Sequence, residues 1–210
     1  MSEDPKRVVE RGYDAIADRF AHWQRGIVGM RAPGRVARLL ARLPPHPEVL
    51  ELGVGAGVEQ SRLLAEHSRL TGVDISAEQL RRARERLPGA RLVRADFTDL
   101  RLPLGSFDAV VACYVLNHVP RGELGQLLGD VAGWLRTGGF FLASFGSSET
   151  LDAVEEDWLG VPMFFAVFEP GTNRRLVLEA GLDIIEDELE PIVEPVHGQG
   201  AFHWIVARKP

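Results

Sequence analysis

The chain has few of the features that stabilise secreted domains or domains with a structural metal. It contains one cysteine in 210 residues, which excludes an intrachain disulfide framework and a cysteine-based metal site. No stretch reaches the ~18 consecutive apolar residues of a membrane-spanning helix. Residues 1–7 also lack the apolar segment of a signal peptide. We therefore expect a cytoplasmic protein with no membrane partner and no bound metal.

Positive charge is scarce as well. The 24 Lys and Arg residues against 30 Asp and Glu give a net charge of -6, whereas a nucleic-acid-binding domain usually shows a basic face. One predicted helix carries Arg81, Arg82, Arg84 and Arg86, but Glu78 and Glu85 are interspersed with them. That pattern is typical of a solvated surface. The sequence favours a small-molecule partner over a nucleic acid, in either a monomer or a homodimer.

What the chain does have is a glycine-rich turn after a short apolar run. Residues 49–57 read VLELGVGAG, with three glycines at every second position after Glu51. An apolar run bounded by glycine predicts a buried strand that ends in a tight turn, and residues 58–65 have helical spacing. Gly53 and Gly55 have no Cβ, so the backbone there can approach a ligand closely. We interpret the segment as a nucleotide-binding corner.

Two classes of nucleotide fit such a corner. The dinucleotide fingerprint G-x-G-x-x-G places a helix N-terminus against a pyrophosphate. In this chain the spacing is G-x-G-x-G, and Val58 takes the place of the third glycine. Glu51 would repel a pyrophosphate but suits a positively charged amino-acid group. Asp74 ends the second predicted strand, where a carboxylate binds ribose hydroxyls in either class.

The E-x-G-x-G-x-G pattern resembles the first motif of class I methyltransferases that use S-adenosylmethionine. That cofactor carries an ammonium and a sulfonium, which suit Glu51. Further motifs follow in the family's order: Asp96-Phe97, the segment LPLGSFDAVVAC over 102–113, and Asn117-His118. The resemblance covers roughly residues 8 to 210. It implies S-adenosyl-L-methionine as the cofactor and methyl transfer to an oxygen or nitrogen of a small-molecule acceptor.

The resemblance also implies which residues contact the cofactor. Asp96 would contact the adenine amino group, and Phe97 would offer its backbone amide to the ring. Tyr13 begins a Y-D-x-x-A-x-x-F segment that covers the cofactor in many members acting on small molecules. The predicted cofactor-binding residues are Tyr13, Glu51, Gly53, Gly55, Asp74, Ile75, Asp96, Phe97 and Cys113.

Strand and helix patterns alternate after residue 47, which predicts a doubly wound α/β fold with a largely parallel sheet. The resemblance implies a Rossmann-like sheet of seven strands whose last strand is antiparallel. We expect an N-terminal helical cap over 1–46 and a methyltransferase core over 47–210. Within that core, residues 147–171 are expected to form a substrate lid.

The predicted lid is rich in aromatic residues, which suits an apolar or planar acceptor. The predicted substrate-binding residues are Asn117, Trp158, Met163 and Phe164. Methyl transfer chiefly requires alignment of donor and acceptor, and a base is needed only if the acceptor must lose a proton. His118 and His203 are the predicted catalytic residues, with His197 a further candidate base.

Two other functions stay open. A nicotinamide-dependent oxidoreductase would share the corner, but the glycine spacing, Glu51 and Asp96-Phe97 disfavour it. A protein of the same fold could also bind the cofactor without transferring its methyl group, because cofactor motifs do not prove chemistry.

Overall fold

The computed structural model describes residues 3–195 and 198–210. Its main body is a seven-stranded sheet of order β3-β2-β1-β4-β5-β9-β8. Strands β1 to β5 are parallel, and β9 runs antiparallel to both β5 and β8. The predicted doubly wound fold with an antiparallel final strand is confirmed. The strands are β1 (Glu48–Leu52), β2 (Arg69–Asp74), β3 (Arg91–Arg94), β4 (Phe107–Ala112), β5 (Leu135–Gly146), β8 (Asp183–Glu194) and β9 (Gly198–Arg208).

The apolar run before the glycines forms a central strand. Strand β1 lies between β2 and β4, and Val49, Leu50 and Leu52 are completely buried. A parallel strand covered on both faces needs such a continuous apolar sequence. The edge strand β8 differs, because charged side chains such as Glu186 and Glu188 alternate along it, which discourages pairing with another chain.

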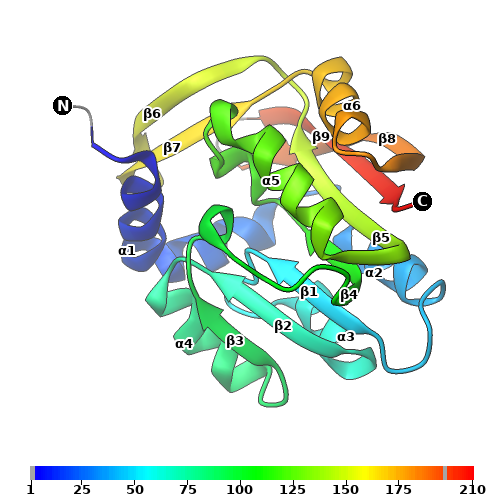
Figure 1. Ribbon diagram of the computed structural model, residues 1–210. Helices are drawn as coiled ribbons and strands as arrows, with labels where there is room; N and C mark the ends of the chain where they lie inside the picture. Colours follow the sequence, from blue (N-terminus) through cyan, green and yellow to red (C-terminus); the bar gives the residue numbers. More distant parts are fainter. Residues whose placement is uncertain (1–2, 196–197) are drawn as a thin grey trace.

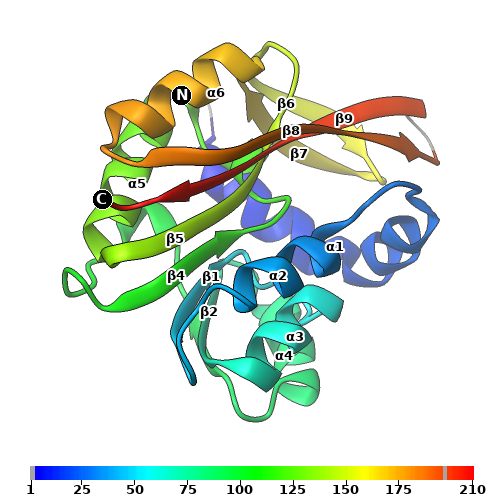
Figure 2. The same ribbon diagram turned by 90° about the vertical axis from the view of Figure 1, so that its right-hand side faces the viewer.

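Helices cover both faces of the sheet (Figure 2). The apolar sides of α2, α3 and α4 pack on one face, and those of α5 and α6 pack on the other. These helices are α2 (Ala32–Leu40), α3 (Glu59–His67), α4 (Ala77–Arg86), α5 (Arg121–Trp134) and α6 (Pro170–Glu179), and short 3₁₀ turns span Phe97–Asp99 and Leu116–His118. None of the described helices combines the length and apolar character needed to cross a bilayer.

A long helix and a hairpin lie together outside the main sheet (Figure 1). Helix α1 (Pro5–Gly26) is capped by Asp4, whose side chain accepts a hydrogen bond from the Lys6 amide. The hairpin consists of β6 (Thr150–Trp158) and β7 (Val161–Val167), which form a sheet of their own. Gly12 allows α1 to lie on β7, since a Cβ there would come within 2.6 Å of Met163 Cε. The segment predicted as a lid is therefore largely a β-hairpin.

The order of the strands places the site. The sheet reverses its winding direction between β1 and β4, and ligands of doubly wound folds bind beyond the carboxyl ends of the strands at such a point. The glycine turn follows β1 there, and Cys113 follows β4. Helix α1 and the hairpin lie over the same end of the sheet (Figure 1).

Candidate functional site

A narrow cavity of about 120 Å³, which we call the corner cavity, lies between α1 and the carboxyl ends of β1, β2 and β4. It is lined by every predicted cofactor residue except Glu51. Residues more than 90 positions apart in the sequence thus meet around one space. The motifs after the three strands and the N-terminal Tyr13 therefore line one space, and their contact with a cofactor stays a prediction.

The glycine turn is held by backbone hydrogen bonds and leaves one position open. The amides of Gly53 and Val54 donate to Val73 O over 2.8 and 3.0 Å. Gly53 has φ +70° and Gly55 has φ +54°, a region that other residues rarely adopt. A Cβ on Gly53 would come within 2.4 Å of Val115, whereas a Cβ on Gly55 would meet nothing within 4 Å. Gly55 therefore leaves backbone accessible where a ligand can approach.

Asp74 fastens this turn from the end of β2. Its Oδ2 accepts a hydrogen bond from the Gly55 amide at 2.8 Å, and its Oδ1 accepts one from the Ser76 amide at 2.9 Å. Burial raises the pKa of Asp74 to about 6, although the hydrogen bonds from Ser76 and Gly55 oppose the shift. The carboxylate lines the corner cavity, and each oxygen can accept a further bond.

Glu51 lies behind the turn instead of on the cavity wall. Its side chain is 1% exposed, and Ser61 Oγ of α3 donates to Oε1 over 2.8 Å. Its Oε2 has no hydrogen-bond partner in the described part of the chain. Burial raises the pKa of Glu51 to about 8 despite the bond from Ser61. Such a carboxylate would be stabilised by a nearby positive charge.

Asp96 meets a lysine that the sequence analysis did not identify. Asp96 Oδ1 accepts hydrogen bonds from the amide and hydroxyl of Thr98, both over 2.9 Å. Lys6 Nζ lies 2.9 Å from Asp96 Oδ2 and 2.8 Å from Glu123 Oε2. Burial lowers the pKa of Lys6, but Glu123 and Asp96 outweigh it and raise that pKa. Helical spacing could have indicated Lys6, because Lys6, Val9 and Tyr13 lie on the side of α1 that lines the corner cavity.

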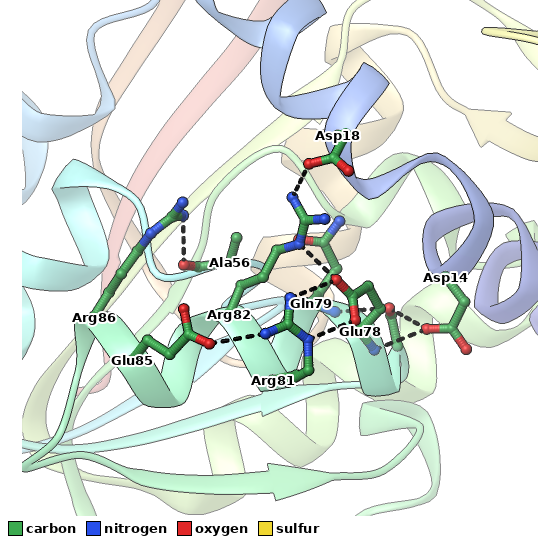
Figure 3. A network of polar contacts seen from close by, with 10 residues as sticks. Asp14, Asp18, Ala56, Glu78, Gln79, Arg81, Arg82, Glu85 and Arg86 are labelled. Carbon is green, nitrogen blue, oxygen red and sulfur yellow. Dashed lines mark hydrogen bonds and ion pairs between the residues drawn. The ribbon is translucent and has the colours of Figure 1, made fainter.

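Polar contacts join α1 to the start of α4 (Figure 3). Asp14 Oδ1 accepts from Ser76 Oγ at 2.5 Å and from the Glu78 amide at 3.0 Å. Asp18 pairs with Arg82 over 2.8 Å. Asp14 thus satisfies a free amide at the helix N-terminus and fixes α1 beside the residues that follow Asp74.

Arg81, Arg82 and Arg86 of α4 each bind a neighbouring residue (Figure 3). Arg81 pairs with Glu78 and with Glu85, each over 2.8 Å. Arg86 Nη1 donates to Ala56 O in the glycine turn over 2.9 Å. This arrangement agrees with the predicted solvated face.

Tyr13 and His118 form a partly buried hydrogen-bonded pair. Tyr13 Oη lies 2.8 Å from His118 Nε2, and His118 Nδ1 lies 2.8 Å from Phe164 O on β7. A carbonyl oxygen only accepts, so Nδ1 carries the proton and Nε2 accepts from the tyrosine hydroxyl. The Asn117 amide also approaches Nε2, at 3.4 Å. Burial lowers the pKa of His118 to about 4, so the ring is neutral and weakly basic.

A second cavity of about 480 Å³, which we call the hairpin cavity, lies beside the first. It is bordered by α1, the hairpin, the end of β8 and the start of β9. The residues that line both cavities are Tyr13, Phe20, Gln24, Tyr114 and His118. The two spaces therefore share a wall that contains the Tyr13–His118 pair.

Two of the predicted substrate residues line the hairpin cavity and two do not. Asn117 and Trp158 are on its wall. Met163 and Phe164 are 0% and 2% exposed and pack in an apolar cluster with α1. Phe165 reaches the hairpin cavity instead. Helix α1 covers the strand at Met163, which the sequence of the hairpin alone does not reveal.

His203 lies apart from both cavities. It is completely buried, with Nε2 3.0 Å from Asp187 Oδ1 and Nδ1 3.3 Å from Asn173 Nδ2. Gln199 and Ala201, earlier on β9, line the hairpin cavity. A catalytic role for His203 remains a prediction that its position does not support. His197 lies outside the described residues.

Tyr114 is a wall residue that the sequence analysis passed over. It follows Cys113 directly, has φ +57°, and its hydroxyl donates to Glu190 Oε1 over 3.0 Å. The sequence could have indicated Tyr114 by its position, because it follows strand β4, whose carboxyl end points into the site. The partner, Glu190, lies 76 residues away and could not be inferred.

Comparison with known proteins agrees with this geometry. Residues 49–139 match the methyltransferase domain family. Trans-aconitate 2-methyltransferase of Rhodopseudomonas palustris is 40% identical over 86 residues, which are 39% of this chain and 33% of that protein. The chain spans less than half the length of the first curated relatives it matches.

Two solved structures have the same fold over nearly their whole length. Magnesium protoporphyrin IX methyltransferase of Synechocystis, with bound S-adenosylhomocysteine, aligns with a TM-score of 0.70 and 17% identity, covering 99% of this chain and 100% of that one. The 1,6-didemethyltoxoflavin-N1-methyltransferase of Burkholderia thailandensis aligns with a TM-score of 0.67 and 22% identity, covering 96% and 90%. That structure holds 1,6-didemethyltoxoflavin and S-adenosylhomocysteine. Residues 49–139 thus resemble a methyltransferase domain, and nearly the whole chain has the fold of these two methyltransferases.

Proposed function

We propose that this protein binds S-adenosyl-L-methionine in the corner cavity and methylates an oxygen or nitrogen of a small molecule held in the hairpin cavity. The observation that carries the proposal is the shared wall at Tyr13 and His118. Methyl transfer needs donor and acceptor side by side with water excluded, and two adjoining cavities provide that arrangement. When bound, the cofactor supplies an electrophilic methyl group on a sulfonium.

The corner cavity contains groups that fit this cofactor. Gly55 leaves room where a Cβ would stand. Asp74 and Asp96 line the wall at the ends of β2 and β3, where carboxylates suit hydroxyl and amino groups. The unpaired Oε2 of Glu51 lies just behind the turn and suits a positive charge. These four residues, with Ile75, Phe97 and Cys113 on the wall, would hold the cofactor.

Helix α1 and the hairpin would close the site. Residues of one side of α1 line the corner cavity, in keeping with a cap over residues 1–46. The hairpin supplies Trp158 and Phe165 to the other cavity, in keeping with a substrate lid over 147–171. Both elements remove water from the space between donor and acceptor, which strengthens polar interactions there.

Tyr13 is the group best placed to orient the acceptor. The Tyr13 hydroxyl donates its hydrogen bond to His118, so the tyrosine oxygen keeps its lone pairs for an incoming N–H or O–H. The low pKa of His118 makes that ring a poor direct base. In this proposal His118 acts through Tyr13, by fixing the direction of its hydroxyl.

Parallel calorimetric titrations with S-adenosylmethionine, S-adenosylhomocysteine and NADH test the proposal. We expect the first two to bind with Kd on the order of micromolar and NADH to remain silent. Binding of NADH alone would contradict the proposal and favour an oxidoreductase. Conversion of S-adenosylmethionine to S-adenosylhomocysteine, followed with a panel of acceptors, separates an enzyme from a protein that only binds the cofactor.

A further inference from the structure

One lysine of α1 contacts three other side chains at the corner cavity. Lys6 Nζ lies 2.9 Å from Asp96 Oδ2 and 2.8 Å from Glu123 Oε2. It also donates a hydrogen bond to Thr98 Oγ1 over 2.7 Å. An ammonium group has three donors, so these partners can occupy all of them. Lys6 thereby ties the first turn of α1 to the segment after β3 and to α5.

The position of Lys6 in its own helix is unfavourable. Lys6 follows Pro5 in the first turn of α1, and that turn contains no acidic residue. The N-terminus of a helix carries partial positive charge, which disfavours a cation there. A residue that breaks such a local rule is expected to be explained by a tertiary or functional contact. The contact with Asp96 is such a contact.

The two carboxylate oxygens of Asp96 have different partners. Oδ1 accepts hydrogen bonds from the amide and the hydroxyl of Thr98, which occupy both of its lone pairs. Oδ2 lies beside Lys6 Nζ and has a second lone pair for a further donor. Lys6 and Asp96 both line the corner cavity. A ligand with an N–H at this end of the cavity can therefore bind the oxygen that Lys6 accompanies.

Lys6 also sets the charge at this end of the cavity. Asp96 and Glu123 share its single ammonium group, and the side chain of Asp96 is only 18% exposed. Without the cation, the two carboxylates would lie close together without a counter-ion, and a carboxylate in that position holds a proton more readily. A protonated Asp96 would present an O–H where the ligand needs a lone pair. The cation therefore keeps Asp96 a hydrogen-bond acceptor.

We propose that Lys6 is a positioning residue, which keeps Asp96 ionised and oriented toward the amino group of the cofactor's base. This inference rests on the proposed binding of S-adenosyl-L-methionine in the corner cavity. Lys6 acts through Asp96: the site accepts a base with an amino group at this edge and rejects a base with a carbonyl oxygen there. Because Lys6 belongs to α1, the cap completes this end of the site when it packs on the core.

Two ligands that differ at one position of the base test the inference. S-adenosylhomocysteine carries an amino group there, and S-inosylhomocysteine carries a carbonyl oxygen in its place. Calorimetry of the full chain with each ligand gives two Kd values, whose ratio we call the base ratio. We expect the unaltered chain to bind S-adenosylhomocysteine at least about tenfold more tightly. Lys6→Met, similar in length and uncharged, should weaken that binding about tenfold or more and reduce the base ratio to below about 3.

Three further variants distinguish this role from simple packing of α1. Glu123→Gln removes the charge that ties Lys6 to α5 but leaves the contact with Asp96. Glu10→Gln weakens an ion pair of 2.5 Å between α1 and Arg94, and neither of those two residues lines the corner cavity. Neither variant should lower the base ratio by more than about twofold. Lys6→Arg keeps the positive charge and should retain a base ratio well above that of Lys6→Met.

The outcomes separate this inference from the proposed function. If the unaltered chain does not bind S-adenosylhomocysteine, the proposed function fails. If that ligand binds but the base ratio is near one, or if Lys6→Met weakens both ligands by the same factor, the inference is wrong and the cofactor site stands. A higher base ratio in Lys6→Met also contradicts it, because Lys6 would then bind the carbonyl oxygen itself. Circular dichroism checks the fold of each variant, and Lys6→Gln replaces Lys6→Met if the latter does not fold.

Discussion

The corner cavity and the hairpin cavity are built by different means. The corner is built from a backbone turn and from carboxylates that end neighbouring strands, such as Asp74 and Asp96. The hairpin cavity is built from side chains of α1, the hairpin and β9, which meet only in the folded chain. Shared chemistry can therefore be encoded in short motifs, whereas acceptor choice depends on packing.

The largest effect should come from the glycine turn. Gly55→Val places a branched side chain in the open space of the corner cavity and should weaken S-adenosylmethionine binding at least about 100-fold, by more than 2.7 kcal/mol. Gly105→Val is the control, because Gly105 has a similar φ of +62° and also faces nothing within 4 Å. Both variants carry a backbone strain of about 1–2 kcal/mol, so only Gly55→Val should lose binding in calorimetry. Equal affinities would place the cofactor elsewhere.

The next effect should appear at the shared wall. Tyr13→Phe removes the hydroxyl of a residue that lines both cavities and should lower kcat roughly 10- to 100-fold, with little change in the Kd for S-adenosylhomocysteine. His118→Asn should give a similar loss, since it removes the group that orients the hydroxyl. Steady-state kinetics beside calorimetry separates the two quantities. Normal kcat in Tyr13→Phe would remove the pair from the mechanism.

A smaller effect tests whether cofactor binding changes the protonation of Glu51, which lies behind the glycine turn. Its pKa of about 8 means that a positive ligand should displace its proton at pH 7.5, about half a proton or more per molecule. Calorimetry in two buffers of different ionisation enthalpy measures that release, and Glu51→Gln should abolish it. An unchanged release in the variant would assign the proton to another group.

The same residue affects stability in a defined direction. Because the pKa of Glu51 in the folded chain is raised, its contribution to the free energy of unfolding is full below about pH 4.5. That contribution is lost as the pH rises to about 8, by up to about 1.4 kcal/mol per pH unit. Urea denaturation of Glu51→Gln should show a flatter dependence between pH 6 and 8.

The smallest effect on activity is expected at His203. His203→Ala removes one hydrogen bond from each of Asn173 and Asp187 and should lower the free energy of unfolding by about 1–3 kcal/mol. We expect kcat per folded molecule to stay unchanged. A tenfold loss of kcat in folded protein would restore the catalytic role predicted from the sequence.

Sequence patterns predicted the sheet and most of the corner because both depend on local order. The run from Val49 to Gly57 specifies a strand, a turn and a helix, and strands that run parallel bring Asp74 and Asp96 to the same edge. Glu51 was misplaced relative to the cavity, because nothing local shows that its side chain turns toward Ser61 of α3.

The lining of the hairpin cavity was predicted less completely, because its walls are formed by tertiary contacts between distant segments. Trp158 was identified, but Met163 proved to lie under Gly12 of α1, a contact between segments 151 residues apart. Lys6 and Tyr114 were missed for the same reason. Their partners, Glu123 and Glu190, come from distant elements.

A crystal structure of the chain with S-adenosylhomocysteine tests the central claim most directly. We predict that the ligand occupies the corner cavity, with hydrogen bonds to Asp74 and Asp96 and with its sulfur beside Tyr13 and His118, facing the hairpin cavity. A ligand in the corner cavity with its sulfur turned away from that wall, or a ligand bound outside the cavity, would contradict the account.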